Sequence, residues 1–210
     1  MRTKKFCTFM YKRIFKRPAD IVISLGALLF AFPFIVPVLL FVFIKTKENP
    51  FFLQKRPGLH EKTFTLIKMR TMVNKYDSDG NLMPDKERLT RWGKFFRAIS
   101  IDEIPQLINV LKGDMSLIGP RPLMTEYLPL YSDHQRRRHL VRPGITGWAQ
   151  INGRNSISWQ QKFDLDVWYV EHICFMVDVK IILLTIKKVF KKEDINRSEE
   201  LTMPVFDGTN

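Results

Sequence analysis

Two adjacent carboxylates, Asp102 and Glu103, precede an arginine held between two prolines, Pro120-Arg121-Pro122. A carboxylate can act as a nucleophile or as a ligand of a divalent cation. Arginine binds phosphate through two parallel hydrogen bonds, and Pro122 keeps Arg121 out of helical geometry. The combination indicates chemistry on a charged, phosphorylated substrate. A surface arginine in a tight turn is the alternative for Arg121.

Ser100 and Glu103 also match a helix capping box, which is a structural alternative. In that case Asp102 only favours the helix start through the helix dipole. Pro105 argues against it, because proline belongs in the first turn of a helix and moves the helix start to Asp102 or later. Both carboxylates are then predicted at the exposed N-terminal end of a short helix.

An uncharged apolar run, residues 21–44, is predicted to hold this site at a membrane. The run is long enough to cross the hydrocarbon core and too long for a signal peptide. Pro33 and Pro37 interrupt it, so it is either a kinked spanning helix or a helix that bends at Pro33 and leaves on the side it entered. Lysines and arginines on both flanks favour the re-entrant form, because positive flanks stay in the cytoplasm.

The chain carries a net charge of +13. Such a balance points to phosphate-rich partners, namely nucleic acid, anionic lipid or a phosphorylated small molecule. The two cysteines, Cys7 and Cys174, make no motif and indicate no disulfide framework. No nucleic-acid-binding motif is recognisable in the sequence.

After the apolar run, residues 51–54 and 64–69 predict two strands joined by a turn over 55–62. Lys68 and Arg70 alternate onto one face of the second strand, and solvated charge at a strand edge is the alternative meaning of both cations. Residues 73–85 are polar and predict a loop.

The rest of the chain is predicted to be mainly helical. Residues 86–100 form an amphipathic pattern typical of a helix in a membrane interface, with a core-packed helix as the alternative. Residues 124–141 predict a helix whose basic run, 136–139, faces solvent. Residues 163–190 predict helix with an amphipathic end, and residues 191–210 are polar and expected to be loosely held.

Five stretches carry a family resemblance. They are Lys16 to Asp20, Lys68 to Met72, Asp102 to Leu107, Gly113 to Ser116 continuing to Leu123, and Arg142 to Gly147 continuing to Asn155. In this order they resemble the bacterial sugar transferases, the monotopic phosphoglycosyl transferases. The resemblance covers nearly the whole chain, and it is greatest to the small members that initiate bacterial N-linked glycan assembly.

The resemblance implies an α-rich α+β fold, in which a re-entrant membrane helix, interfacial amphipathic helices and a small β-hairpin surround one cytosolic-face catalytic domain. It implies a basic segment and re-entrant helix over 1–48, a catalytic domain over 49–192 and a tail over 193–210. The expected location is the cytosolic face of the bacterial inner membrane. The chain departs from several members in one respect, since Phe32 replaces a serine before Pro33.

The resemblance also implies a reaction, the transfer of a phosphosugar from a UDP-sugar to polyprenyl (undecaprenyl) phosphate with release of UMP. Asp102 would be the nucleophile that forms a covalent phosphosugar-aspartate, and Mg²⁺ would bind at Asp102 with Glu103 as candidate second ligand. The other implied roles are phosphate binding by Arg121, Arg97 and Lys68, and membrane anchoring by Arg17, Asp20 and Pro33. Among donors, UDP-diacetylbacillosamine is expected ahead of UDP-GalNAc and UDP-hexoses.

Two other functions are compatible with parts of the sequence. A membrane-tethered basic module that binds anionic lipid or nucleic acid explains the charge and the apolar run, but gives no reason for Asp102 and Glu103 beside Arg121. An enzyme of the same family could use another acceptor or transfer in a single step.

Overall fold

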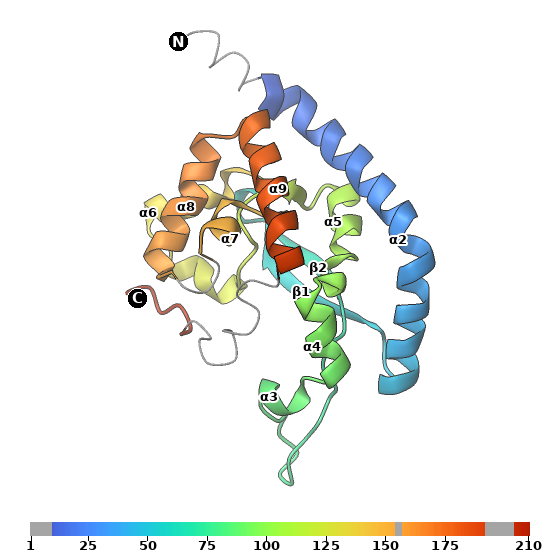
Figure 1. Cartoon of the computed structure of the whole chain (residues 1–210). Coiled ribbons are helices and arrows are strands. Elements are labelled where there is room, and N and C mark those ends of the chain that lie inside the picture. Colours follow the sequence, from blue (N-terminus) through green and yellow to red (C-terminus); the bar gives the residue numbers. More distant parts are fainter. Residues whose placement is uncertain (1–9, 154–156, 192–203) are drawn as a thin grey trace.

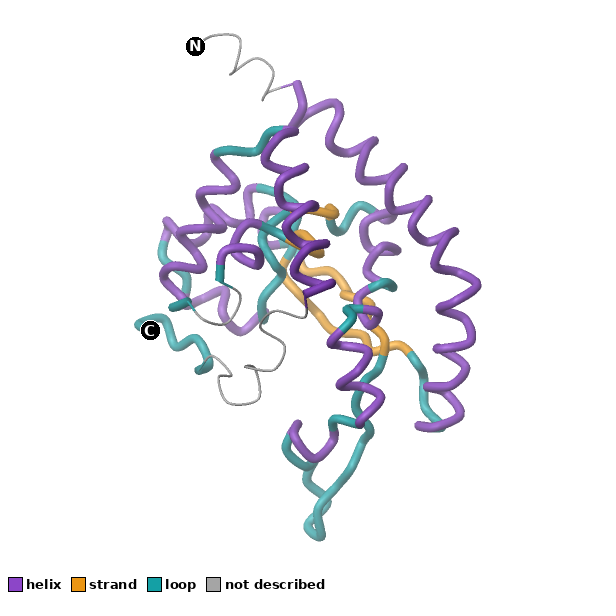
Figure 2. Tube along the Cα trace, viewed as in Figure 1, coloured by secondary structure: helices purple, strands orange, loops and turns teal. Residues whose placement is uncertain are grey.

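The computed structural model describes residues 10–153, 157–191 and 204–210. A long N-terminal helix lies along one side of a small helical domain, whose strands lie near its centre (Figures 1 and 2). Residues 1–9, which include the first basic side chains of the chain, lie outside the described residues. So do 192–203 of the predicted tail, and Arg154 and Asn155 of the last family stretch.

The predicted apolar helix is confirmed as α2 (Lys16–Thr46), which follows one π-helical turn at Tyr11–Phe15. Pro33 and Pro37 both lie within α2, and its axis turns midway in Figure 1. Within the described ranges it is the one helix long and apolar enough to cross a membrane, and 11% of its most apolar window is buried in the protein. Most of its apolar surface is therefore free to face lipid.

The start of α2 is fastened to the folded domain by two charged residues. Arg17 donates to the carbonyl oxygens of Leu111 and Met115, at 3.2 and 3.3 Å. The buried Asp20 accepts a hydrogen bond of 2.7 Å from Ser116 Oγ. Arg17 thus satisfies carbonyl groups at the end of a neighbouring helix, as a cation at a helix C-terminus can.

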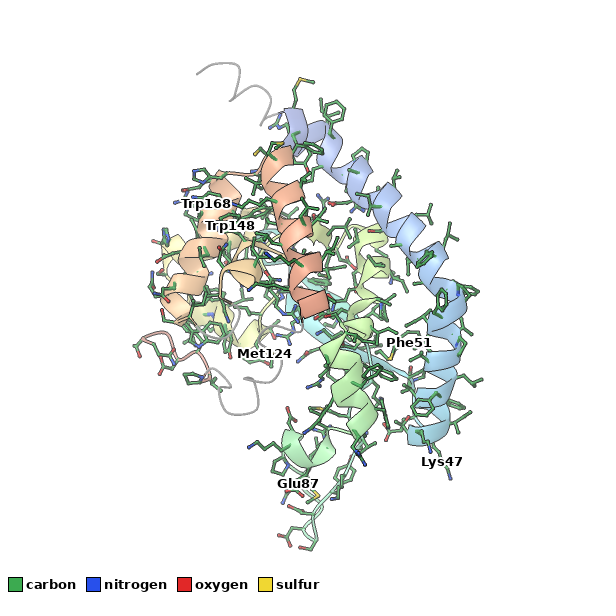
Figure 3. All side chains as sticks on the ribbon, viewed as in Figure 1. Lys47, Phe51, Glu87, Met124, Trp148 and Trp168 are labelled. Carbon is green, nitrogen blue, oxygen red and sulfur yellow. The ribbon has the colours of Figure 1, made fainter. Side chains whose placement is uncertain are left out.

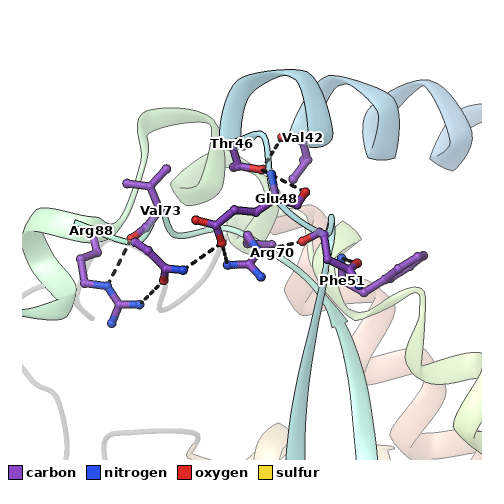
Figure 4. A network of polar contacts seen from close by, with 9 residues as sticks. Val42, Thr46, Glu48, Phe51, Arg70, Val73 and Arg88 are labelled. Atoms are coloured by element: carbon purple, nitrogen blue, oxygen red, sulfur yellow. Dashed lines mark hydrogen bonds and ion pairs between the residues drawn. The ribbon is translucent and has the colours of Figure 1, made fainter. Parts of the chain in front are cut away.

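The end of α2 is fastened to the same domain. Val42 is fully buried and clusters with Met69 and Phe96. Beyond the helix, Glu48 Oε2 accepts from Arg70 at 2.5 Å and from Asn74 at 2.8 Å (Figure 4).

The predicted hairpin is confirmed as β1 (Phe51–Pro57) and β2 (Thr63–Met69), which pair antiparallel. β1 extends three residues beyond the predicted end at Gln54. The strand continues because the turn closes later, where Gly58 N donates to Lys62 O at 2.9 Å. The predicted loop at 73–85 carries an isolated bridge between Tyr76 and Leu82.

A second pair of strands was not predicted. β3 (Ser116–Ile118) and β4 (Gly144–Thr146) pair in parallel. Gly119, directly after β3, lies against Gly144, the first residue of β4. A Cβ on Gly144 would lie 2.1 Å from the nitrogen of Gly119. Glycine at both positions lets the segment before Arg121 run against the segment after Arg142.

The single helix predicted over residues 86–100 is wrong. Two helices replace it, α3 (Asp85–Arg88) and α4 (Arg91–Ala98). Thr90 separates them, because its extended backbone and its Oγ1, which accepts from Gly93 N at 3.0 Å, start a new helix. Phe96 of α4 is buried, whereas Phe95 is 57% exposed.

The single helix predicted over residues 124–141 is also wrong. A 3-10 segment at Thr125–Leu130 contains Pro129, α6 spans Asp133–Arg136, and a second 3-10 turn spans Arg137–Leu140. Ser132 caps α6 in a capping box with Gln135, which restarts the helix after the proline.

The remaining helices are α5 (Gln106–Lys112), α7 (Trp148–Asn152), α8 (Trp159–Glu171) and α9 (Phe175–Lys191). The last two confirm that residues 163–190 are largely helical, with a break between Glu171 and Phe175. Trp148 stacks on Trp168 with ring centroids 4.4 Å apart (Figure 3), which joins α7 to α8.

The expectation of a loosely held tail is wrong for residues 204–210. Phe206 is 2% exposed and packs among Tyr131, Trp159 and Phe163. Trp159 Nε1 also donates to Pro204 O at 2.9 Å. The described part of the chain is mainly helical with a small hairpin and one long apolar helix, as predicted. The β3–β4 pair adds a second small sheet.

Candidate active site

Asp102 and Glu103 lie in a 3-10 turn, Ile101–Glu103, between α4 and α5. Ser100 has a left-handed backbone with φ of 57° and makes no side-chain cap, so the capping-box alternative is wrong. α5 begins at Gln106, directly after Pro105. The prediction that the helix starts beyond Ser100, with both carboxylates before its N-terminal end, is confirmed. The predicted exposure is wrong for Asp102, which is buried.

Glu103 joins two cations that come from distant parts of the chain. Its Oε1 accepts from Arg121 Nη2 at 2.6 Å and from Lys68 Nζ at 3.3 Å. Burial alone raises the pKa of Glu103, but the charges and hydrogen bonds of Arg121 and Lys68 outweigh it and lower the pKa to about 2. Glu103 is therefore ionised at neutral pH and holds both cations beside Asp102.

Asp102 has a different environment, although it is the adjacent residue. Asp102 is 7% exposed. Its carboxylate makes no hydrogen bond or ion pair with any described residue. Burial first, and the Glu103 charge second, raise the pKa of Asp102, while Lys68, Arg97 and Arg121 act in the opposite direction. A carboxylate with cations nearby, and none bonded to it, is available to an incoming phosphoryl group.

Arg97 is positioned by Thr71, which lies two residues after the end of β2. Arg97 lies in the last turn of α4, and its Nε donates to Thr71 Oγ1 at 3.0 Å. The structure therefore brings together all five residues predicted for the site: Lys68, Arg97, Asp102, Glu103 and Arg121.

The backbone of Arg121 is fixed by Arg138, a residue that sequence reasoning missed. Arg138 Nη2 donates to the carbonyl oxygen of Arg121 at 2.6 Å and to Asp166 Oδ2 at 2.8 Å. Arg138 and Asp166 are each 2% exposed, so the predicted solvated face is wrong for Arg138. The partner lies 28 residues away on α8, and a run of basic residues carries no sign of such pairing.

Two further cations near Arg121 were missed. Burial, and then the Arg121 charge, lower the pKa of Arg56 on β1. Burial also lowers the pKa of Lys162 on α8 to about 8, with Arg121 among the minor causes. Had β1 been predicted at its full length, its pairing with β2 could have indicated Arg56. Arg56 pairs with Phe64, which lies four residues before Lys68 and so on the same face of the sheet.

The three predicted membrane-anchor residues do not enter the site. Arg17 and Asp20 bind α5 and β3, and Pro33 lies in the middle of α2.

The fit of the site to Mg²⁺ depends on two carboxylates. No group of three or more His, Cys, Asp or Glu side chains gathers within residues 10–153, 157–191 and 204–210. Mg²⁺ is usually held by one or two carboxylates together with substrate phosphates and water. Asp102 fits such a site, whereas Oε1 of Glu103 is already engaged by two cations.

Comparison with known proteins gives a consistent result. The bacterial sugar transferase family matches residues 11–192. The uncharacterized sugar transferase EpsL of Bacillus subtilis is 53% identical over 93% of this chain and 97% of its own length. The undecaprenyl-phosphate galactose phosphotransferase of Salmonella typhimurium is 34% identical over 86% of this chain. The UDP-glucose:undecaprenyl-phosphate glucose-1-phosphate transferase of Xanthomonas campestris is 34% identical over 85%. The chain spans about two fifths of the length of these last two relatives, 41% and 39%.

Proposed function

Because the chain belongs to the bacterial sugar transferase family, we propose that it transfers a sugar phosphate from a UDP-sugar to undecaprenyl phosphate and releases UMP. Relatives named for this type of transfer support the proposal. The observation that carries it is the buried Asp102 carboxylate next to Lys68, Arg97 and Arg121. A basic module that merely binds lipid would not need a buried carboxylate at the centre of its cations.

In the first displacement, an Asp102 oxygen attacks the phosphorus that carries the sugar. The bond from this phosphorus to the oxygen bridging the two phosphates breaks, and UMP leaves with that oxygen. Positive charge from Arg121, Lys68 and Arg97 stabilises the oxygens of the transition state. The raised pKa of Asp102 makes its ionised form a stronger nucleophile than an exposed aspartate.

In the second displacement, a phosphate oxygen of the lipid acceptor attacks the same phosphorus. The acyl phosphate bond breaks, and the Asp102 carboxylate is restored. Two displacements on one carboxylate make the donor and acceptor half-reactions separable.

Mg²⁺ bound at Asp102 would neutralise phosphate oxygens and hold them in line. Glu103, whose Oε1 is held by Arg121 and Lys68, then acts as the residue that orients the two cations.

The contacts of α2 bear on the membrane topology. Its start and its end both contact one domain, which supports a helix that re-enters on the cytosolic face. The acceptor phosphate then lies at the surface from which this domain works.

The test is an assay of UMP release over a panel of donors: UDP-diacetylbacillosamine, UDP-GalNAc, UDP-galactose and UDP-glucose. At least one is expected to release UMP without acceptor, in an amount close to that of the enzyme, and to leave labelled phosphosugar on the protein. Asp102→Asn should abolish the adduct, while Asp85→Asn, at a highly exposed carboxylate, should keep it. Full turnover by Asp102→Asn would show that another group attacks, and UMP release that strictly requires acceptor would favour a single-step transfer.

A further inference from the structure

Arg56 faces the candidate active site from the opposite end of the hairpin to Lys68. In the register of β1 and β2, Phe52 pairs with Lys68 and Arg56 pairs with Phe64. Alternate residues of a strand, and residues directly opposite each other, share one face of the sheet. Lys68 and Arg56 therefore lie on the same face, roughly 13 Å apart along the strands at about 3.3 Å per residue.

The guanidinium of Arg56 is incompletely satisfied. Its Nη2 donates to Gln54 Oε1 at 2.7 Å, but its Nε is buried and has no acceptor. No described carboxylate forms a hydrogen bond with Arg56, and Arg121 is the charged group that acts on it most. Two neighbouring arginines with a buried free donor are suited to an anion that offers several oxygens.

The position of Arg56 indicates which phosphate this anion is. Met69, the neighbour of Lys68, packs against Val42 of α2, so the Lys68 end of the hairpin is next to the membrane helix. The Arg56 end is next to the Thr125–Leu130 turn, where Gln54 Nε2 lies 3.6 Å from Met124 Sδ. In the first in-line displacement, the attacking Asp102 and the leaving UMP lie on opposite sides of the phosphorus. The charges that act on Asp102 are those of Glu103, Lys68, Arg97 and Arg121, so Arg56, at the other end of the hairpin, lies on the side away from Asp102. The lipid phosphate reaches the site from the α2 side, which leaves the Arg56 end to the UMP part of the donor.

We propose that Arg56 and Arg121 form a second phosphate subsite that binds the uridine-linked phosphate of the donor. This inference rests on the proposed function, since it assumes a UDP-sugar donor. It gives Arg56 a substrate-binding role apart from Lys68, Arg97 and Asp102.

The experiment measures UMP binding to the full chain in detergent by titration calorimetry at fixed salt. Arg56→Gln should weaken UMP binding by about 10- to 100-fold, the size expected for one charge-assisted contact. Arg56→Lys should weaken it less, because it keeps the charge and loses the planar fork. Lys55→Gln, which removes the same charge from the exposed neighbouring side chain, should leave UMP binding unchanged. Uridine, which lacks the phosphate, should bind all four proteins alike.

Equal UMP affinity in the wild type and Arg56→Gln would overturn the inference, as would a wild type that does not bind UMP. An increase confined to the KM of undecaprenyl phosphate would assign Arg56 to the acceptor instead. If Arg56→Gln fails to match the melting temperature of Lys55→Gln, the comparison passes to Arg56→Lys. Failure of the proposed function is a separate result, namely a wild type that binds UMP but releases none from any UDP-sugar.

Discussion

Two adjacent carboxylates have different surroundings here, which supports the different roles that we propose for them. Glu103 is bonded to Arg121 and Lys68, which lower its pKa to about 2 despite burial. Asp102 is buried without a bonded cation, and burial and Glu103 raise its pKa. Environments that push neighbouring pKa values apart are a common means of separating catalytic roles. In the proposed mechanism they leave Asp102 for attack and Glu103 for positioning.

The charges around Asp102 predict opposite shifts in the pH dependence of the first half-reaction. In the proposed mechanism Asp102 attacks only when ionised, so the rate should fall as the pH drops through its pKa, which lies above the ordinary value of 3.8. Glu103→Gln removes a neighbouring anion and should move this acidic limb to lower pH. Lys68→Met removes a cation and should move it to higher pH. Single-turnover UMP release without acceptor, measured against pH, gives both values.

Asp85→Asn is the control for this pair, because its carboxylate is exposed and pairs with Arg88 and not with a residue of the site. Circular dichroism at each pH separates loss of rate from loss of fold. Shifts of the same sign in both variants would mean that the acidic limb does not belong to Asp102.

The site could be predicted from sequence only where its residues form local motifs. Asp102, Glu103 and Arg121 are conspicuous because of their neighbours Pro105, Pro120 and Pro122. Arg138 and Asp166 were missed because only the tertiary fold brings them together. A buried ion pair between distant helices leaves no periodic pattern in the sequence.

At the scale of elements, glycine contacts fix where α4 packs. A Cβ on Gly93 would lie 2.0 Å from Thr71 O, and Thr71 also positions Arg97. Gly93→Ala should therefore destabilise the protein by roughly 1–3 kcal/mol through overpacking, and lower the rate through Arg97. Differential scanning fluorimetry should show a fall of about 2–4 °C for each kcal/mol lost.

Gly26→Ala provides the matched control, since a Cβ there meets nothing within 4 Å and the residue is also helical. Its stability should stay within about 1 kcal/mol of the wild type. A stable, fully active Gly93→Ala protein would show that α4 can move away from Thr71 without cost.

The ion pair between Arg138 and Asp166 predicts a separation of stability from activity. Arg138→Met alone leaves a buried, unpaired Asp166 and should cost roughly 3–5 kcal/mol. The double variant Arg138→Met/Asp166→Leu removes both charges and should recover much of this loss. It still lacks the donor to Arg121 O, so its rate of UMP release should remain low.

Chemical denaturation measures the stability of both variants, and single-turnover kinetics measures their rates. Full recovery of both properties in the double variant would show that Arg138 stabilises the fold without positioning Arg121. Arg137→Met is the control, since that arginine pairs with Glu171 at the surface with 44% of its side chain exposed.

The secondary structure was predictable where an element is long or regular. The apolar run gave α2, and alternating strands with a Pro-Gly turn gave the hairpin. The predicted helices over 86–100 and 124–141 failed at Thr90 and Ser132, whose side chains cap new helices within otherwise helical patterns. β3 and β4 have three residues each, too few to show strand periodicity.

At the scale of the molecule, the contacts between α2 and the folded domain limit how α2 can lie in a membrane. A helix of 31 residues would be about 46 Å long if straight, and the hydrocarbon core is about 30 Å thick. Arg17 and Asp20 hold one end of α2 to the domain, and Val42 and Glu48 hold the other. If α2 spanned the bilayer as a straight helix, the charged domain that is fixed to both of its ends would have to extend through the bilayer. The contacts at both ends therefore favour a helix that lies with both flanks on one side.

This topology predicts the accessibility of both flanks of α2. In a chain with Cys7 and Cys174 replaced by serine, single cysteines are placed at the exposed positions Lys12 and Lys47, before and after the apolar run. A membrane-impermeant maleimide should label neither in spheroplasts and both in inverted vesicles, because the proposed topology places both flanks on the cytosolic face. Phe30→Cys, at a position 77% exposed on the protein surface, should react only after detergent removes the lipid. Labelling of Lys12→Cys from outside, with Lys47→Cys protected, would establish a spanning helix and require the contacts of Arg17 and Asp20 to break in the membrane.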